Sequence, residues 1–264
     1  MIRLSSVANE RVRRVLALQR STRRRYREGV MVAEGQRIIS ELLSSTVSPH
    51  EVYVTSAFAT SNPAVVAQLA SLSEVVALAE VTDDVMQAMA DTVTPQGILA
   101  VLPIPQLQAC HGERLLLIPD QVRDPGNLGT MLRTAWAAGV TKVLLPPGTV
   151  DHTNSKVVRA GMGAHFHLPI AQVEWGKLWE EVGDAQVWLA EARHGASYDT
   201  IDWRGDVALI IGGEAEGAGE PSRRASQYVR IPMAMGVESL NAAVAAAILL
   251  FEAFRQRSGR RPDA

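Results

Sequence analysis

The sequence predicts an α/β fold: a mostly parallel sheet with helices on both faces, preceded by a smaller α/β domain. Short aliphatic runs that end at Gly, Pro or Asp alternate with helical stretches along the chain. This alternation is typical of parallel sheets, because each crossover lays a helix on a face of the sheet. The segment 103–114, PIPQLQACHGER, interrupts it with two prolines and a glycine. We therefore expect a linker there, between a domain at 1–105 and a second domain at 113–264.

The first domain begins with a predicted helix over 7–19, which would start after Ser5 or Ser6. Further helices are expected over 36–45, 64–72 and 82–91, the second of them preceded by Pro63 at its first turn. Strands are expected over 30–35, 51–55, 75–79 and 97–102.

The second domain repeats the alternation with more apolar strands. These are expected over 115–120, 142–147, 186–192, 206–213 and 228–233, with helices that start near Asn127, Asn154, Glu174, Glu220 and Ser239. Ligands of open α/β sheets bind outside the carboxyl ends of the strands. The informative residues should therefore follow the strands that contain LLLI, VALII and YVRI.

Composition and charge exclude several classes of protein. The longest apolar run, Ala242–Phe251, is half of the roughly 20 residues that a membrane span needs. The start MIRLSSVANERVRRV lacks the apolar region of a signal peptide, and the single Cys110 excludes an internal disulfide. We expect a cytoplasmic protein that does not enter a membrane. Six histidines, of which only His165 and His167 have ligand-like spacing, predict no metal site.

The first 30 residues hold nine arginines and only two acidic residues, although the net charge of the chain is −2. Such a segment can be a solvated helix face. An all-arginine basic arm also suits directional contact with RNA phosphates. The candidate RNA-binding residues are Arg11, Arg13, Arg14, Arg23, Arg24 and Arg25, with Lys156 and Arg159 in the second domain.

Polar residues and glycines follow three of the predicted strands. After LLLIPD, the turn at 124–127 ends in Asn127, a good helix cap, and Arg133 lies beside the apolar stripe of the next helix. On the helix alone, Arg133 can equally be a rim residue. After VALII comes a loop with Gly212, Gly213 and Glu214, without the lysine of a phosphate loop. Its glycines would let the backbone approach a ligand with a neutral or positive centre.

The third strand end is followed by Ile231-Pro232-Met233 and then by Glu238, Ser239 and Asn241, at the start of a long apolar helix. A helix cap explains one of these three polar residues. It does not explain all of them. We therefore interpret the loop as part of a binding site.

These segments together resemble the SpoU (TrmH-type) branch of the SPOUT RNA 2′-O-ribose methyltransferases. DPGNLGTMLRTA, LIIGGEAEG and IPMAMGVESLNAAVAAAILLFEA are similar to its three motifs, in order, and NSKVVRAGMGAHFHLPI is similar to a further family segment. Residues 1–105, through VAEGQRIISELL, look more loosely like the small RNA-binding domain related to kink-turn-binding ribosomal proteins. Gly161 and Ala242-Ala243 depart from residues common in the family.

The resemblance implies methyl transfer from S-adenosylmethionine to a ribose 2′-hydroxyl, a deep trefoil knot in the C-terminal domain, and a homodimer through that domain. The implied catalytic residues are Arg133, Asn127, Glu214, Ser239 and Asn241. The implied cofactor-binding residues are Ile211, Gly212, Gly213, Gly217, Ile231, Met233, Ser239 and Leu240.

The appended first domain favours ribosomal RNA over transfer RNA as the substrate. Two other functions remain open on the sequence. One is a non-catalytic RNA-binding protein that keeps a knotted dimerisation fold; the other is an α/β enzyme with a different nucleotide cofactor. Retention of all five implied catalytic residues argues against the first, and the lysine-free glycine loop argues against the second.

Overall fold

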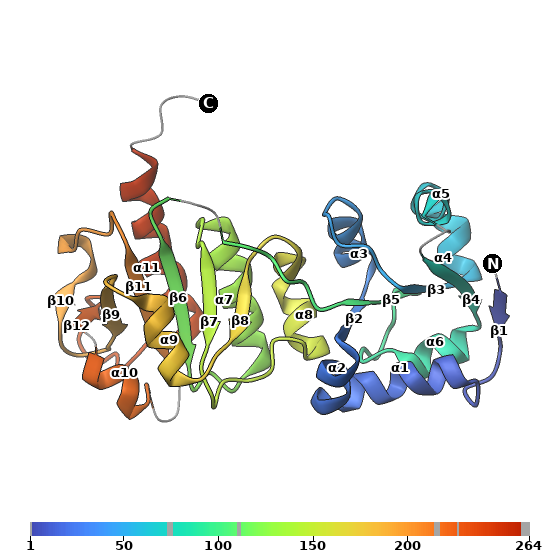
Figure 1. The fold of residues 1–264 in the computed structure, drawn as a ribbon, viewed down its shortest axis with the longest axis horizontal. Coiled ribbons are helices and arrows are strands. Elements are labelled where there is room, and N and C mark those ends of the chain that lie inside the picture. The colour runs from blue at the N-terminus through green and yellow to red at the C-terminus, as the bar shows by residue number, and fades with distance from the viewer. Residues whose placement is uncertain (1, 73–75, 110–111, 214–216, 226, 260–264) are drawn as a thin grey trace. The chain divides into compact units, whose positions relative to one another are not determined.

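The computed structural model describes residues 2–72, 76–109, 112–213, 217–225 and 227–259. It divides into two compact units (Figure 1): Met1–Pro105 with Asp151–Phe166, and Gln106–Val150 with His167–Ala264. The sequence predicted an unbroken second domain over 113–264. The structure differs because residues 151–166 leave that domain and pack in the first unit, where Val158 and Phe166 are buried beside Met31 and Ile38.

The first unit is built on a five-stranded mixed sheet in the order β1-β4-β3-β5-β2. Its strands are β1 (Ile2–Leu4), β2 (Val30–Glu34), β3 (Glu51–Thr55), β4 (Ala77–Val81) and β5 (Ile98–Pro103). Strand β4 runs parallel to β1 and β3, whereas β5 is antiparallel to both β3 and β2. The sheet is therefore only partly parallel.

The helices of the first unit are α1 (Glu10–Arg20), α2 (Thr22–Glu28), α3 (Gln36–Leu43), α4 (Ser56–Ser61), α5 (Pro63–Ser71), α6 (Asp83–Met89), α8 (Ser155–Gly161) and the 3₁₀ turn η1 (Ala164–Phe166). Helix α1 starts later than predicted, because the Asn9 side chain rather than Ser5 or Ser6 accepts from the backbone of Arg11 and caps it. Val12, Val15 and Leu18 bury its apolar face.

The second unit contains a seven-stranded sheet in the order β10-β12-β9-β11-β6-β7-β8, in which every neighbouring pair is parallel. Its strands are β6 (Leu115–Asp120), β7 (Lys142–Leu145), β8 (Ile170–Gln172), β9 (Gln186–Ala190), β10 (Ala196–Ser197), β11 (Val207–Gly212) and β12 (Gln227–Arg230). The predicted α/β fold with a mostly parallel sheet is confirmed for this unit.

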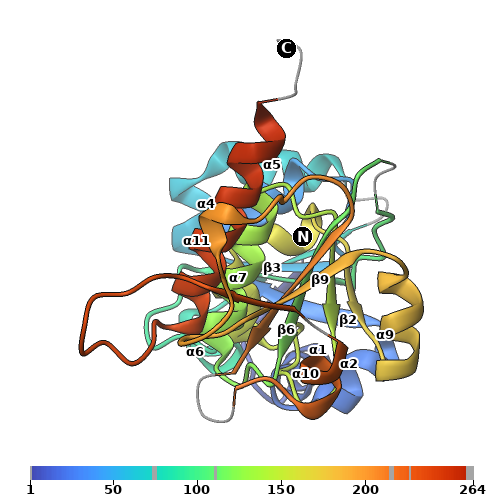
Figure 2. The ribbon, with the colours of Figure 1, turned by 90° about the vertical axis from the view of Figure 1, so that its left-hand side faces the viewer.

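The helices of the second unit are α7 (Pro125–Ala137), α9 (Trp175–Val182), α10 (Glu220–Ala225), α11 (Ala242–Ser258) and the 3₁₀ turn η2 (Tyr198–Thr200). Helices α7 and α11 lie side by side on one face of the sheet, and α9 covers the other (Figure 2). Leu178 and Val182 of α9 pack on Ile118 and Ile210 of the sheet. Burial of these aliphatic side chains is the main source of stability for this layered packing.

Two predicted helix starts are corrected by the structure. Helix α7 begins at Pro125, and the Asp124 side chain, not Asn127, caps it, with 2.8 Å between Asp124 Oδ1 and the backbone N of Asn127. Helix α11 begins at Ala242, later than the predicted start near Ser239, and of the two candidate caps, Ser239 and Asn241, it is Asn241 that caps the helix. Capping therefore does not account for the side chains of Asn127 and Ser239. No helix in the described residues is long and apolar enough to span a membrane.

Candidate active site

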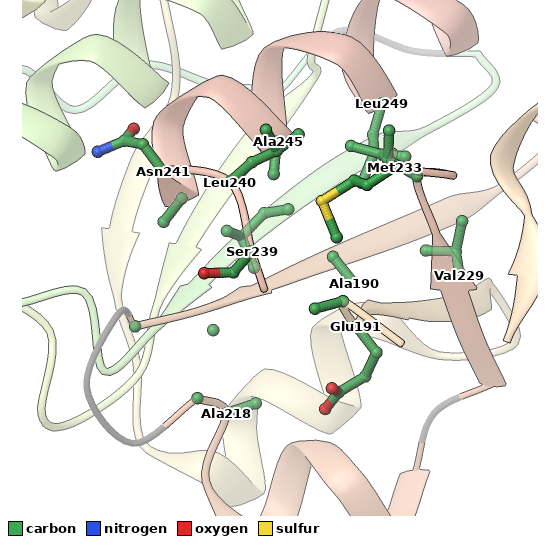
Figure 3. A pocket seen from close by; sticks show the side chains of 17 residues that line it. Ala190, Glu191, Ala218, Val229, Met233, Ser239, Leu240, Asn241, Ala245 and Leu249 are labelled. Atoms are coloured by element: carbon green, nitrogen blue, oxygen red, sulfur yellow. The ribbon is translucent and has the colours of Figure 1, made fainter. Parts of the chain in front are cut away.

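A cavity of about 450 Å³ lies where the chain leaves the carboxyl ends of β9, β11 and β12 (Figure 3). We call it the cofactor cavity. All eight predicted cofactor-binding residues line it: Ile211, Gly212, Gly213, Gly217, Ile231, Met233, Ser239 and Leu240. Asn241 and the first turns of α11 complete the wall. The position agrees with the rule that ligands bind at the carboxyl edge of an open parallel sheet.

Sequence reasoning missed the residues that β9 contributes. Ala190, Glu191 and Ala192 line the cavity, and so do Ala218, Val229, Ala242, Ala245 and Leu249. The signal that could have found Glu191 was its place directly after an apolar strand, QVWLA, that is central in the sheet. The end of β6, by contrast, was predicted to carry ligand contacts and does not line the cavity.

The described glycines after β11 are packed closely against other backbone. Gly213 and Gly217 form a bridge, with 3.0 Å between the backbone N of Gly217 and the backbone O of Gly213. A Cβ atom at Gly212 would lie 2.5 Å from the backbone N of Ala218, and one at Gly213 would lie 2.1 Å from the backbone O of Gln121. These glycines are therefore required by backbone packing, which adds to the ligand approach that the sequence suggested.

The two residues at the end of β6 hold both ends of this loop. Asp120 is fully buried; its Oδ2 accepts from the backbone N of Gly219 at 2.6 Å and from Ser222 Oγ at 2.8 Å. Gln121 adopts a φ of 60°, an uncommon conformation for a residue with a side chain, and its carbonyl lies against Gly213. The end of β6 thus positions the loop of the cofactor cavity without lining it.

Two of the predicted catalytic residues contact each other across α7 and α11. The Nδ2 atom of Asn241 donates to Oδ1 of Asn127 over 3.0 Å, while Oδ1 of Asn241 caps α11. Ser239 lies two residues earlier on the cavity wall. In Figure 3 the amide of Asn241 points away from Glu191. The polar residues at the start of α11 therefore divide between capping, the Asn127 contact and the cavity.

Of the other two predicted catalytic residues, the structure describes only Arg133. Arg133 is exposed on α7 and does not line the cavity. Six residues beyond Asn127, it lies roughly 9 Å further along the helix axis. Glu214 falls outside the described residues. Their catalytic roles stay predictions.

The arginine-rich start is not a free arm, because α1 and α2 are packed into the first unit. Arg11, Arg13 and Arg23 are exposed, and their contacts with RNA stay predictions. Arg14 and Arg24 are half-buried, and each bonds to Glu28 at 2.7 Å. Lys156 is exposed, and Arg159 pairs with Asp91 over 3.3 Å.

The prediction that Arg25 contacts RNA is wrong. Its side chain is 3% exposed and pairs with Asp151. It also donates to Thr153 Oγ1 at 2.8 Å and to the carbonyl of Leu18 at 2.7 Å. Burial acts to raise the pKa of Asp151, but the bonds from Arg25 and Thr153 outweigh it and lower that pKa below its usual value. Arg25 therefore fastens the segment 151–166 to α2.

The residues of the cofactor cavity fit S-adenosylmethionine. The volume lies in the range of roughly 300–1,000 Å³ that is usual for small-molecule sites. Ile211, Met233 and Leu249 offer apolar contact, while the glycine loop offers backbone polar groups. Among the described lining residues there is one carboxylate, Glu191, and no lysine or arginine. This charge pattern suits a ligand with a cationic centre and disfavours a polyphosphate.

The parallel sheet, the cavity at its carboxyl edge and the motifs that line it define the class of SPOUT-type methyltransferases. The SpoU rRNA methylase family model matches residues 114–251, and a model of the MRM3-like substrate-binding domain matches residues 9–100. The chain belongs to the SpoU rRNA methylase family.

Relatives of known name cover nearly the whole chain. The human mitochondrial rRNA methyltransferase 3 is 33% identical over 97% of this chain and 74% of its own length. The 23S rRNA (guanosine(2553)-2′-O)-methyltransferase RlmP of Bacillus subtilis is 32% identical over 95% of this chain and 98% of its own.

Solved structures give the same result. An rRNA methyltransferase from Sinorhizobium meliloti, crystallised with S-adenosylmethionine, is 29% identical over 96% of this chain and 97% of its own, with a TM-score of 0.81. The SpoU methyltransferase AviRb from Streptomyces viridochromogenes, in complex with the same cofactor, is 25% identical over 96% of this chain and all of its own, with a TM-score of 0.84.

Proposed function

We propose that this chain methylates a ribose 2′-hydroxyl in ribosomal RNA with S-adenosylmethionine as the methyl donor. As a member of its family it is an RNA 2′-O-ribose methyltransferase, and S-adenosylmethionine is its cofactor. The observation that carries this proposal is the cofactor cavity: all eight residues implied by the motifs line one space at the carboxyl edge of a parallel sheet.

The chain's own residues then bind and orient the reactants. The bound cofactor supplies an electrophilic methyl group. In this proposal Ser239 and the bonded pair Asn127–Asn241 hold the ribose; Ser239 and Asn241 line the cavity, and Asn241 bonds to Asn127, which supports these roles. Holding the hydroxyl in line with its target and excluding water are the main tasks in such a displacement.

Arg133 acts in this proposal as a cation, not as a base. A guanidinium offers five N–H donors and no acceptor, so it can bind an anion but is poorly suited to take up a proton. Exposed on α7, it can grip the RNA phosphate next to the target ribose and stabilise the developing alkoxide. The proton of the 2′-hydroxyl then passes to that phosphate or to water. Glu214 would hold its loop or the arginine in place.

Ribosomal RNA is favoured over transfer RNA by two comparisons. The human and Bacillus subtilis relatives that span this chain are both named as rRNA methyltransferases. The first unit matches a substrate-binding domain of MRM3 type. A solved structure concerned with methylation of C/U34 on tRNA covers only 56% of this chain. The match of the first unit to the MRM3-like domain is therefore what this unit adds in support of ribosomal RNA.

The homodimer and the knot are also part of the proposal. An apolar stripe on α11 supports a dimer, since Val244 and Phe251 are 48% and 47% exposed, with Trp136 of α7 36% exposed. The knot is supported by the chain's return from β12, outside β9 in the sheet, to α11, which packs against α7 and β11. Phe251→Glu should give monomers by light scattering; an unchanged dimer would place the contact elsewhere.

We also propose a cytoplasmic location, consistent with the single cysteine.

Calorimetry separates the proposal from its rivals. The chain should bind S-adenosylmethionine and S-adenosylhomocysteine and should not bind NAD. Binding of NAD alone would favour an enzyme with another nucleotide cofactor. Absence of binding to all three would favour a non-catalytic RNA-binding protein.

A further inference from the structure

The first unit contains a second cavity, of about 410 Å³, whose walls come from α3, α4, α6 and the chain before β5. We call it the amide cavity, because Gln36, Asn62, Gln87 and Gln96 line it. Phe58, Met86 and Pro95 add apolar surface. Within the described lining the only charged residue is Asp83, so nothing there neutralises a phosphate.

Hydrogen bonds within the protein determine which polar atoms of these amides remain available for a ligand. The backbone N of Gln36 donates to Oε1 of Gln96 at 2.8 Å, so Gln96 keeps its NH₂ group available. Asn62 donates through Nδ2 to the carbonyl of Phe58 and accepts from Nε2 of Gln36 at 2.8 Å. Gln36 therefore keeps its carbonyl oxygen available. Gln87 donates to the carbonyl of Val93 at 3.2 Å, which leaves its own oxygen available.

The loop before β5 is held at both of its ends. Glu34 is 6% exposed, accepts from the backbone N of Asp91 at 2.9 Å and also bonds to the hydroxyl of Thr92. Gly97 has a φ of 80°, and a Cβ atom there would lie 2.6 Å from Oγ1 of Thr55, so the chain passes close to the end of β3. The amide cavity is thus formed in advance of binding, which lowers the entropy cost of recognition.

We propose that the amide cavity takes an unpaired nucleobase of the RNA substrate. This rests on the proposed function and names the site by which the first unit reads its RNA. One available NH₂ group and two available carbonyl oxygens complement a base edge that carries both donors and acceptors. Proteins read single-stranded RNA through such edges, and a neutral, partly apolar cavity excludes the phosphate but accepts the base. The exposed Arg37, next to Gln36, supplies a cation for the flanking phosphate.

The test compares two RNA probes that differ only in their bases. Fluorescence anisotropy would measure binding of the full chain to a single-stranded RNA of mixed sequence, about 12 nucleotides long, and to an abasic oligomer with the same backbone. The wild type should bind the base-containing probe about 10-fold more tightly, within the range for one good base contact.

Two variants of the cavity test this preference. Gln96→Glu keeps the oxygen that accepts from Gln36 but removes the NH₂ donor, and Ala57→Leu narrows the cavity without touching an amide. Each variant should reduce the preference for the base-containing probe over the abasic probe to about 2-fold or less. Gln68→Ala, an exposed amide on α5 outside the cavity, should leave it unchanged. Arg23→Ala should weaken both probes equally, because it removes a phosphate contact.

The proposal is overturned if the wild type binds both probes alike, or if both folded cavity variants keep the full preference. Thermal denaturation checks that the variants are folded. Binding of S-adenosylmethionine, measured on the same samples, reports on the other unit. A chain that binds S-adenosylmethionine but binds both RNA probes with equal affinity would contradict this inference. It would not contradict the proposed methyl transfer.

Discussion

The two cavities have similar volumes, about 450 and 410 Å³, and opposite chemistry. The cofactor cavity is made largely by glycine and aliphatic residues in short runs at the ends of β9, β11 and β12 and at the start of α11. The amide cavity is made by side-chain amides from four separate segments of a mixed-sheet unit. A site formed by short runs of residues at strand ends therefore leaves compact motifs in the sequence. A site formed by side chains from distant segments leaves no such motif.

The largest expected effect separates the stability of the two units. Arg25→Ala leaves the largely buried carboxylate of Asp151 without its cationic partner and should destabilise the first unit by about 3–5 kcal/mol. Urea denaturation monitored by hydrogen exchange would measure this loss of unfolding free energy in each unit. Arg23→Ala, at an exposed neighbouring position, is the control. If the amides of the parallel sheet in the second unit lose as much hydrogen-exchange protection, the two units unfold together. That result would contradict separate stabilities of the two units.

The next effect separates chemistry from cofactor binding. Arg133→Ala should lower the methylation rate at least ~100-fold, because one charge-stabilising donor is lost. Affinity for S-adenosylmethionine should be unchanged, since Arg133 lies outside the cofactor cavity. Single-turnover rates and calorimetry measure the two quantities. Near-normal turnover would remove Arg133 from the mechanism.

A smaller effect tests the closure of the glycine loop. Gly213→Ala places a methyl group against the carbonyl of Gln121, and overpacking of this kind costs about 1–3 kcal/mol. We expect cofactor affinity to fall roughly 10-fold or more, since about 1.4 kcal/mol corresponds to a factor of ten. Gly176→Ala in α9, where the added Cβ meets nothing within 4 Å, is the matched control. Wild-type affinity in Gly213→Ala would show that the loop can shift freely.

The last effect is a pH dependence that comes from two buried histidines of the first unit. Burial lowers the pKa of His152 to about 4, and burial with the nearby His152 lowers the pKa of His165 to about 3. The unfolded chain, with a histidine pKa of about 6.5, binds protons first as the pH falls. Stability is therefore complete above about pH 6.5 and falls towards pH 4, by up to ~1.4 kcal/mol per pH unit for each histidine.

Chemical denaturation at about pH 7.5 and about pH 5.5, on either side of the ordinary histidine pKa, checks this dependence. His152→Asn should reduce the loss of stability between the two values. An identical loss in the variant and the wild type would assign it to other groups.

The sequence alone predicted the parallel sheet and a set of residues that line one cavity at its edge, because both depend on local patterns. Gly212, Ile231 and Leu240 lie in or after the apolar strands β11 and β12, and strand ends meet at one edge.

Prediction from the sequence failed where a side chain has several possible hydrogen-bond or ion-pair partners that are distant in the sequence. Nothing near Arg25 in the sequence shows that it will pair with Asp151, and nothing near Gln96 shows that Gln36 will orient it. Asp124 and Asn127 are both good caps by residue type, and only the structure shows that Asp124 takes the role.

The central claim is tested most directly by supplying ribosomal RNA and S-adenosylmethionine with an isotopically labelled methyl group, then digesting the RNA to nucleosides for mass spectrometry. We predict label on the ribose of one nucleotide position, as a 2′-O-methyl nucleoside, and loss of that label in Arg133→Ala. Label on a base, label only in transfer RNA, or no transfer by a chain that binds the cofactor would contradict it.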